Sequence, residues 1–234
     1  MLASNSDSAE INKFTALADQ WWDVDGPCKP LHIINPLRLE FLETWQTLKG
    51  KKVIDVGCGG GIFAEAMAQR GAEVTGIDKS GALIDVAKKH AADNQLPIDY
   101  FSAEAESFAT HQRESYDVVC CMELLEHVPC PLSLIQACSQ LAKPNARIFF
   151  STINRNPRAY FLAILGAEHL LKILPRGTHD YKKFIRPSEL ALAGRKAYLT
   201  LQKLQGIHYN PILQHYALSD DIRINYLAAF RKRA

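Results

Sequence analysis

The sequence lacks a strong charge of either sign. Its 27 lysines and arginines face 25 aspartates and glutamates, which leaves a formal net charge of only +2 at pH 7. Proteins that bind nucleic acid do so through many basic side chains that neutralise phosphates. We therefore expect no nucleic acid among the partners of this chain.

Long hydrophobic runs are also missing. The longest nearly apolar stretch covers residues 159–167, far below the roughly 20 residues that span a bilayer. Residues 1–10 are polar and acidic, without the basic and apolar regions of a signal peptide or the arginines of a transit peptide. These absences predict a protein that remains in the cytoplasm and does not cross a membrane.

The cysteines lack the paired spacing of a zinc site. Of the six, Cys120 and Cys121 lie in an apolar run with the composition of a strand, which favours a reduced cytoplasmic protein. A chain of 234 residues, 47% of them hydrophobic, can bury one sizeable core but is short for two. We expect one main domain with appendages.

A glycine-rich turn in residues 51–61 is the most informative feature that is present. The apolar residues Val53, Ile54 and Val56 precede it and an amphipathic segment, 62–70, follows it. This order predicts a buried parallel strand that turns directly into a helix. Ligands of such folds lie across the strand-to-helix turn.

Strand and helix patterns alternate after this turn, which predicts a parallel sheet with helices on both faces. The predicted strands are 53–56, 73–77, 98–101, 116–122 and 147–152, and the predicted helices are 62–70, 82–92, 104–110 and 131–142. Beyond Thr152 the pattern predicts a helix over 157–174, a basic loop, and strands at 199–204, 213–218 and 222–227.

Two helices are predicted before the first strand. Residues 1–9 are expected to be disordered, residues 11–21 have apolar side chains at helical spacing, and residues 36–45 begin with a proline suited to a first turn. These helices could cover a ligand site or pack on an edge of the sheet. The sequence pattern alone does not distinguish between these two roles.

The glycine spacing argues against a nicotinamide dinucleotide. Glycines at 57, 59 and 61 give G-x-G-x-G, whereas the dinucleotide fingerprint needs a glycine where Ile62 stands. A pyrophosphate needs the N-terminus of a closely packed helix as an anion site. A sulfonium cofactor without phosphates needs only open backbone and nearby acids.

Asp55 and Asp78 supply two such acids. Asp78 closes the second predicted strand, where a carboxylate can accept hydrogen bonds from both hydroxyls of an adenosine ribose. Its alternative role is the N-cap of the helix that follows Ser80.

Several motifs together resemble the class I S-adenosylmethionine-dependent methyltransferases: 55–61, the Gly-Ile-Asp of 76–78, and 116–129. The flanks narrow the resemblance to the bacterial ubiquinone-biosynthesis O-methyltransferases. They are the Trp-Trp-Asp of 21–23, residues 30–39, the Gly-Thr-His-Asp of 177–180, and residues 206–211.

This resemblance implies a fold and a division of the chain. The fold is α/β, a Rossmann-like three-layer sandwich with a mostly parallel seven-stranded sheet and an antiparallel C-terminal strand. Residues 1–47 would form a helical lid over the cofactor site, and residues 48–234 the S-adenosylmethionine-binding domain. Within that domain, 153–186 would be an inserted segment with an amphipathic helix that gates substrate or docks on a membrane.

The resemblance also implies the reaction, which is transfer of a methyl group from S-adenosylmethionine to a phenolic hydroxyl. The implied acceptors are 2-polyprenyl-6-hydroxyphenol and 3-demethylubiquinol. The predicted cofactor-binding residues, carried over by motif or assigned from the turn and its acids, are Arg38, Asp55, Gly57, Gly59, Asp78 and Met122. On sequence alone, Met122 is the more typical of a core methionine.

A phenol must lose a proton with a pKa near 10 before it attacks. Glu123, Glu126 and His127 are spaced i, i+3 and i+4 after the fourth predicted strand, so on a helical turn they share one face. They are our catalytic candidates, as a general base or as ligands of a divalent cation that acidifies the phenol. In related eukaryotic enzymes this set resembles a Mg²⁺ site.

The alternative is that Glu126 and His127 only support the loop by their contacts. His32 and His179 are weaker candidates for the general base.

The segment 153–186 combines apolar helical spacing with a net charge of +5, from seven basic residues against Glu168 and Asp180. Such a pairing suits docking on an anionic membrane surface; the alternative is a core helix with a solvated basic loop. The resemblance favours docking through 157–186, on the inner face of the bacterial inner membrane. Expected partners are the polyprenyl phenol or quinol, that surface, and other enzymes of ubiquinone biosynthesis.

Other function classes give different expectations. An NAD-dependent oxidoreductase would bind nicotinamide, a membrane scaffold would show no turnover, and a methyltransferase of another small molecule would use the same sheet domain. One departure from the family is Pro144-Asn145-Ala146, where Pro-Gly-Gly is usual. Asparagine can adopt the left-handed conformation that glycine provides.

Overall fold

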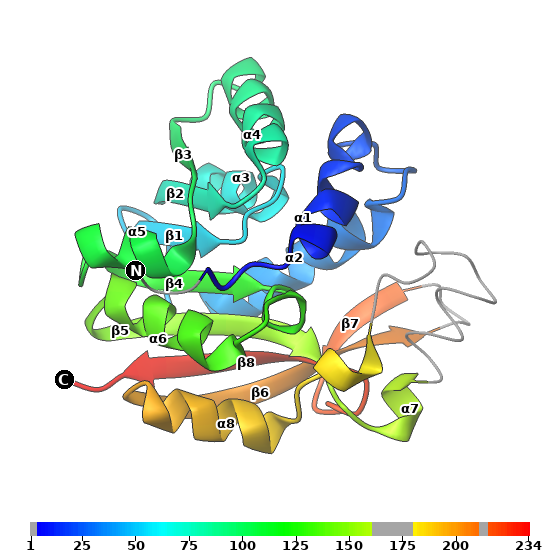
Figure 1. Cartoon of the computed structure of the whole chain (residues 1–234), viewed down its shortest axis with the longest axis vertical. Coiled ribbons are helices and arrows are strands. Elements are labelled where there is room, and N and C mark those ends of the chain that lie inside the picture. Colours follow the sequence, from blue (N-terminus) through cyan, green and yellow to red (C-terminus); the bar gives the residue numbers. More distant parts are fainter. Residues whose placement is uncertain (1–3, 161–179, 211–214) are drawn as a thin grey trace.

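The computed structural model describes residues 4–160, 180–210 and 215–234 as an α/β fold around one twisted sheet (Figure 1). The sheet has eight strands in the order β3-β2-β1-β4-β5-β8-β6-β7. In chain order they are β1 (Lys52–Val56), β2 (Glu73–Asp78), β3 (Ile98–Ser102), β4 (Tyr116–Met122), β5 (Ala142–Ile153), β6 (Leu199–Asn210), β7 (His215–Ser219) and β8 (Asn225–Lys232).

Strands β1 to β5 pair in parallel, and the three C-terminal strands pair antiparallel. The predicted α/β class and mostly parallel sheet are confirmed. The sheet has eight strands where seven were expected, because β6, β7 and β8 all join it. The order reverses between β1 and β4, so the carboxyl ends of these two strands flank the crevice in which such folds bind ligands.

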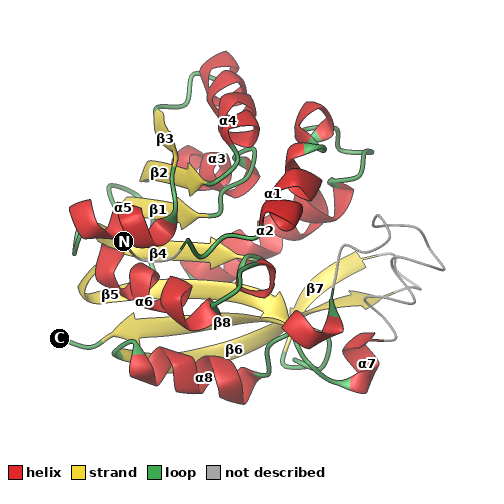
Figure 2. Ribbon diagram, in the orientation of Figure 1, coloured by secondary structure: helices red, strands yellow, loops and turns green. Residues whose placement is uncertain are grey.

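Helices cover both faces of the sheet (Figure 2). They are α1 (Ser8–Thr15), α2 (Lys29–Glu43), α3 (Ile62–Gln69), α4 (Gly81–Asp93), α5 (Ala105–His111), α6 (Pro131–Leu141), α7 (Pro157–Ala159) and α8 (Pro187–Lys196), with short 3₁₀ turns η1 (Ala18–Gln20), η2 (Leu125–His127) and η4 (Tyr181–Lys183).

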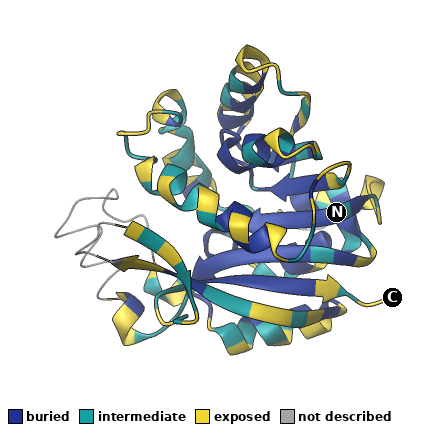
Figure 3. Cartoon of the chain, turned by 180° about the vertical axis from the view of Figure 1, so that it is seen from behind, coloured by how far each residue is buried: buried dark blue, intermediate teal, exposed yellow. Residues whose placement is uncertain are grey.

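Each face of the sheet has its own hydrophobic core. One core packs strand residues such as Ile54 and Phe150 against α5, α6 and α8, and the other packs Val53 and Phe149 against α2, α3 and α4. Adjacent residues alternate between the cores because successive side chains of a strand point to opposite faces. The central strands are therefore buried, while β6 and β7 at the edge carry exposed residues (Figure 3).

The N-terminal segment differs from its prediction. Helix α1 begins at Ser8, within the part expected to be disordered, because the Asp7 side chain accepts hydrogen bonds from Ala9 N and Glu10 N and caps it. Helix α2 begins at Lys29, so Pro36 lies inside it rather than in its first turn. The missing N–H of Pro36 is tolerated there.

The C-terminal half shows three further differences. Helix α8 was not predicted. Its Gly194 packs against the Phe230 ring, because a Cβ on this residue would lie only 2.5 Å from a ring carbon of Phe230. Strand β5 begins five residues earlier than expected, and within it Asn145 has φ +65°, the left-handed conformation predicted for that position. The helix predicted over 157–174 lies mostly outside the described residues, which retain its first turn as α7.

Within the described residues, no helix has the length and apolarity that crossing a membrane requires.

Candidate active site

The glycine turn between β1 and α3 has the backbone that its sequence predicts. Gly57, Gly59 and Gly61 have φ values of +76°, +54° and +93°, which side-chain-bearing residues rarely adopt. A Cβ on Gly61 would lie 2.5 Å from the Tyr100 hydroxyl. Ile62, which replaces the last glycine of the dinucleotide fingerprint, is buried in a cluster with Trp21 and Leu83.

Asp78 at the end of β2 fixes this turn from the neighbouring strand. Its Oδ2 accepts a hydrogen bond from Gly59 N at 3.0 Å, and its Oδ1 accepts one from Ser80 N at 2.8 Å. Ser80 is the N-cap of α4, so the N-cap alternative for Asp78 is wrong. Burial raises the pKa of Asp78, and these backbone hydrogen bonds oppose the rise.

Asp55 and Arg38 are both buried and interact electrostatically. Asp55 lies in β1, and burial raises its pKa to about 7, against the attraction of the Arg38 guanidinium. Arg38 is only 4% exposed, and its Nε and Nη2 have no hydrogen-bond partner among the described residues. Nη2 lies 3.5 Å from Glu123 Oε1. A buried guanidinium with unused donors suits a ligand carboxylate.

Met122 ends β4 and is 7% exposed. It belongs to the core that packs against α2, α3 and α4. This burial fits the interpretation of Met122 as a core residue. The predicted contact of Met122 with the adenine stays a prediction.

Two tryptophans of the N-terminal segment contact the glycine turn. A Cβ on Gly59 or on Gly60 would overlap the Trp21 ring, and Trp22 Nε1 donates a hydrogen bond to Gly60 O at 2.9 Å. Trp22 also stacks on His90 with ring centroids 3.4 Å apart. The pair at 21–22 was a sequence signal for the family, but its contact with the turn was not predicted.

The base candidate His32 is engaged elsewhere, because its Nε2 lies 3.0 Å from Trp21 O. The other weaker candidate, His179, lies outside the described residues.

Glu123 and Glu126 follow β4 but face different partners. Glu123 has φ +50°, and its N donates to Ser151 O at 3.1 Å. Glu126 is buried; its Oε2 accepts a hydrogen bond from Thr152 Oγ1 at 2.8 Å, and its Oε1 has no partner among the described residues. Burial, with the nearby Glu123 charge, raises the pKa of Glu126 to about 8.

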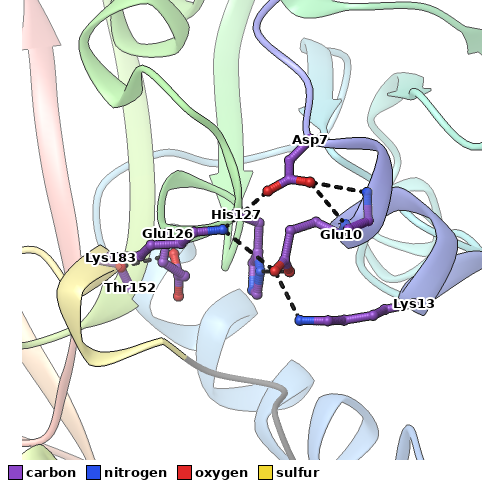
Figure 4. A network of polar contacts seen from close by, with 8 residues as sticks. Asp7, Glu10, Lys13, Glu126, His127, Thr152 and Lys183 are labelled. Carbon is purple, nitrogen blue, oxygen red and sulfur yellow. Dashed lines mark hydrogen bonds and ion pairs between the residues drawn. The ribbon is translucent and has the colours of Figure 1, made fainter.

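His127 faces the N-terminal helix. Its Nδ1 lies 2.9 Å from Glu10 Oε2 of α1, and the Phe14 ring meets it edge-on with centroids 5.0 Å apart. Lys183 of η4 lies 3.3 Å from Asp7 Oδ2 and 3.5 Å from Glu10 Oε1 (Figure 4). No pattern in the sequence pointed to Glu10, since 117 positions separate it from His127.

The three catalytic candidates do not converge as metal ligands. The Glu123 carboxylate pairs with Arg38, the Glu126 carboxylate accepts a hydrogen bond from Thr152, and His127 Nδ1 contacts Glu10. In the described part of the chain, no three or more histidine, cysteine, aspartate or glutamate side chains are grouped so as to hold a metal ion. The residues present do not fit the Mg²⁺ site that the resemblance implied.

Solved structures share this fold. The magnesium protoporphyrin IX methyltransferase of Synechocystis PCC 6803, with bound SAH, superposes with a TM-score of 0.70 over 97% of this chain and 100% of that chain, at 16% identity. A SAM-dependent methyltransferase from Aquifex aeolicus gives 0.62 over 92% and 97%, at 12% identity. The fold is that of the class I S-adenosylmethionine-dependent methyltransferases.

The family follows from sequence comparison. A family model described as a methyltransferase domain matches residues 32–204. The ubiquinone biosynthesis O-methyltransferase of Stutzerimonas stutzeri is 56% identical over 224 residues, covering 96% of this chain and 97% of that protein. The protein of the same name from Saccharophagus degradans is 56% identical over 229 residues, covering 97% of both. The chain belongs to this family of S-adenosylmethionine-dependent O-methyltransferases.

Proposed function

We propose that the chain transfers the methyl group of S-adenosylmethionine to a phenolic oxygen of 2-polyprenyl-6-hydroxyphenol and of 3-demethylubiquinol in ubiquinone biosynthesis. Support comes from relatives of that name at 56% identity over nearly the whole chain. The observation in the site that carries the proposal is a buried histidine, His127, at the end of η2, the 3₁₀ turn that follows the strand whose end flanks the cofactor crevice.

The residues of the crevice fit the proposed cofactor. The unused donors of Arg38 suit the carboxylate of its amino-acid part, and Asp78 suits its ribose hydroxyls. Gly57 and Gly59 supply the backbone of the turn, with Leu124 and Trp21 filling the space that their Cβ atoms would need. Asp55 and Met122 complete the predicted set. When bound, S-adenosylmethionine supplies an electrophilic methyl group on a sulfonium.

In this proposal the chain provides the base and the surroundings of the reaction. An unperturbed phenol ionises near pH 10, so His127 takes its proton as the oxygen attacks. With its raised pKa, Glu126 is mostly protonated at neutral pH and can donate a hydrogen bond to the phenolate. Glu123 holds the Arg38 guanidinium in place. No step uses a metal.

We propose that residues 1–47 cover the cofactor site. The contacts of Trp21 and Trp22 with the glycine turn support this role, as does the position of Arg38 on α2. Loops and helices that close over a site exclude water from the reaction.

We also propose that residues 157–186 dock on an anionic membrane, supported by the net charge of that part of the sequence. Each basic residue near lipid headgroups is worth about 1 kcal/mol. Replacing Lys172, Arg176 and Lys182 by glutamine should weaken flotation with phosphatidylglycerol vesicles about 100-fold. The same change at the exposed Lys49, Lys88 and Lys89 is the matched control and should have little effect. Equal loss in both triple variants would contradict docking by this segment.

The function is tested by methyl transfer to a prenylated catechol in vesicles. We expect turnover that is abolished by Asp78→Ala, together with loss of saturable S-adenosylmethionine binding. A chelator in a parallel reaction tests the metal role: the geometry predicts unchanged turnover. Turnover that falls with the chelator and returns with Mg²⁺ would contradict the metal-free reaction, and no transfer to any prenylated catechol would contradict the function itself.

A further inference from the structure

The contact between Glu10 and His127 joins two distant parts of the chain. Glu10 lies on α1 and His127 on η2, and both are largely buried, with relative exposures of 9% each. The distance of 2.9 Å between Glu10 Oε2 and His127 Nδ1 is that of a short, charge-assisted hydrogen bond (Figure 4).

Glu10 is held as an anion. Burial raises its pKa, but hydrogen bonds from Lys13 and His127 outweigh that effect and the net shift is downward. Lys13 Nζ lies 2.9 Å from Oε1, and Lys183 Nζ lies 3.5 Å from the same oxygen. Both lysines therefore engage Oε1, and Oε2 is the oxygen that faces the histidine.

An ionised carboxylate can only accept hydrogen bonds. The proton of the Glu10–His127 hydrogen bond must therefore be on Nδ1. In a neutral imidazole one nitrogen carries the proton and the other a lone pair. The geometry thus places a proton on Nδ1, so that whenever the ring is neutral its lone pair is on Nε2.

We propose that Glu10 is a positioning residue, which holds His127 in the Nδ1–H tautomer and so keeps Nε2 as the atom that accepts the phenolic proton. This inference rests on the proposed O-methyl transfer for its catalytic part, while the tautomer is a property of the protein alone. It gives helix α1 a role in the reaction beyond covering the crevice.

The surroundings of the ring support a fixed orientation. Phe14, one turn after Glu10 on α1, meets the imidazole edge-on at an interplanar angle of 88°. Asp7 caps α1 and binds Lys183, so the N-terminus of the helix is tied to η4. Glu126 precedes the histidine, but its Oε2 is taken by Thr152. Among these groups, Glu10 is the acceptor that contacts Nδ1.

Nitrogen NMR tests the tautomer directly. Full-length protein labelled with ¹⁵N-histidine is recorded at a mildly alkaline pH, where imidazoles are neutral, and the His127→Gln spectrum assigns the signal. We expect Nδ1 of His127 to be protonated in the wild type, with a shift toward the Nε2–H form in Glu10→Ala. An Nε2–H ring in the wild type, or an unchanged ring in Glu10→Ala, would overturn the proposal even if the enzyme is active.

Kinetics test whether the contact serves the reaction. Glu10→Ala should lower kcat about 10-fold or more, since general base catalysis contributes about 10²–10⁴, with the KM for S-adenosylmethionine nearly unchanged. The glutamine of Glu10→Gln offers both an acceptor and a donor to Nδ1, so the kcat of this variant should lie between those of the wild type and Glu10→Ala. In a His127→Gln background, Glu10→Ala should cause no further loss of kcat, because both residues act through one group.

Asp7→Asn is the matched control, because asparagine can still cap α1 but loses the charge that binds Lys183. It should leave kcat nearly unchanged. If it matches Glu10→Ala, or if Glu10→Ala lowers kcat equally in the His127→Gln background, the residue only docks α1 and the positioning role is wrong. If the wild type fails to methylate a prenylated catechol, the function fails, and the NMR result still decides the tautomer.

Discussion

The Trp21 ring occupies the space that a Cβ on Gly59 would need. One residue comes from the segment before the sheet domain and the other from the turn that opens it, so the contact locks the N-terminal segment onto the glycine turn. Trp21 is only 6% exposed, and burial of a tryptophan contributes several kcal/mol. Gly59 is thus constrained twice, by its left-handed backbone and by its neighbour.

The substitution Gly59→Ala should destabilise the protein more than backbone strain alone explains. Strain at a left-handed residue costs roughly 1–2 kcal/mol, and overlap with Trp21 adds to it. Gly50 provides the control: its φ is +69°, but a Cβ there would meet nothing within 4 Å. Denaturant unfolding should show a larger loss for Gly59→Ala than for Gly50→Ala.

The overlap with Trp21 can be isolated in a double variant. In a Trp21→Ala background the ring is gone, so Gly59→Ala should cost only its strain, close to the cost of Gly50→Ala. If the effects of Trp21→Ala and Gly59→Ala simply add, the ring does not press on the turn in solution.

The substitution Arg38→Met should weaken S-adenosylmethionine binding. Removing a hydrogen bond to a charged group costs about 1.5–3 kcal/mol, which corresponds to a roughly 10- to 100-fold rise in Kd. Isothermal titration calorimetry measures it. Arg70→Met is the matched control, because Arg70 forms an ion pair with Glu43 at 3.6 Å in which both side chains are well exposed. Equal Kd values for Arg38→Met and the wild type would show that this guanidinium does not bind the cofactor.

Asp55 should make the stability of the protein fall as pH rises. Its pKa is about 7 in the folded protein, against an ordinary value of 3.8, so the folded state holds a proton that the unfolded state loses. The stability from the neutral form is complete below pH 3.8 and is lost as pH rises toward 7, at about 1.4 kcal/mol per pH unit. Asp55→Asn removes this dependence, so its stability relative to wild type should rise across that window and then level off.

Asp117→Asn is the control of opposite sign. Burial raises the pKa of Asp117, but hydrogen bonds from Lys143 and from the backbone of Lys52 lower it overall. Its ionised form stabilises the fold, and that contribution is lost on acidification. Urea unfolding across the pH range compares both variants. A constant difference between Asp55→Asn and the wild type would contradict the buried, protonated Asp55.

The sequence predicted what local patterns determine. Apolar runs broken by glycine located β1 and β2, and Asn145 took its expected left-handed conformation. The predicted contact of Asp78 with a ribose stays a prediction; the structure shows its hydrogen bond to the glycine turn. Helix α8 was not predicted, although Pro187 in its first turn and Glu189 at its N3 position are sequence signals of a helix N-terminus. The sequence pattern predicted eight strand segments, whereas the count of seven strands in the sheet came from the resemblance. The composition of the three C-terminal segments could not show that all of them join one sheet.

The prediction that Glu123, Glu126 and His127 share one face was wrong because it assumed a continuous helix. Spacing of i, i+3 and i+4 aligns side chains only on a continuous helix. Here η2 covers only Leu125–His127, and Glu123 stands before it with φ +50°, so the three side chains diverge. The partner of His127 could not be predicted either, because Glu10 reaches it only through the packing of α1.

The fate of a labelled methyl group tests the proposed function most directly. The protein is incubated with [methyl-¹³C]S-adenosylmethionine and a prenylated catechol in vesicles, and the product is analysed by NMR and mass spectrometry. The proposed function predicts one ¹³C methyl on a phenolic oxygen for each S-adenosylhomocysteine formed, with loss of the product in His127→Gln. Label on a ring carbon or on nitrogen, or cofactor turnover without a methylated phenol, would contradict it.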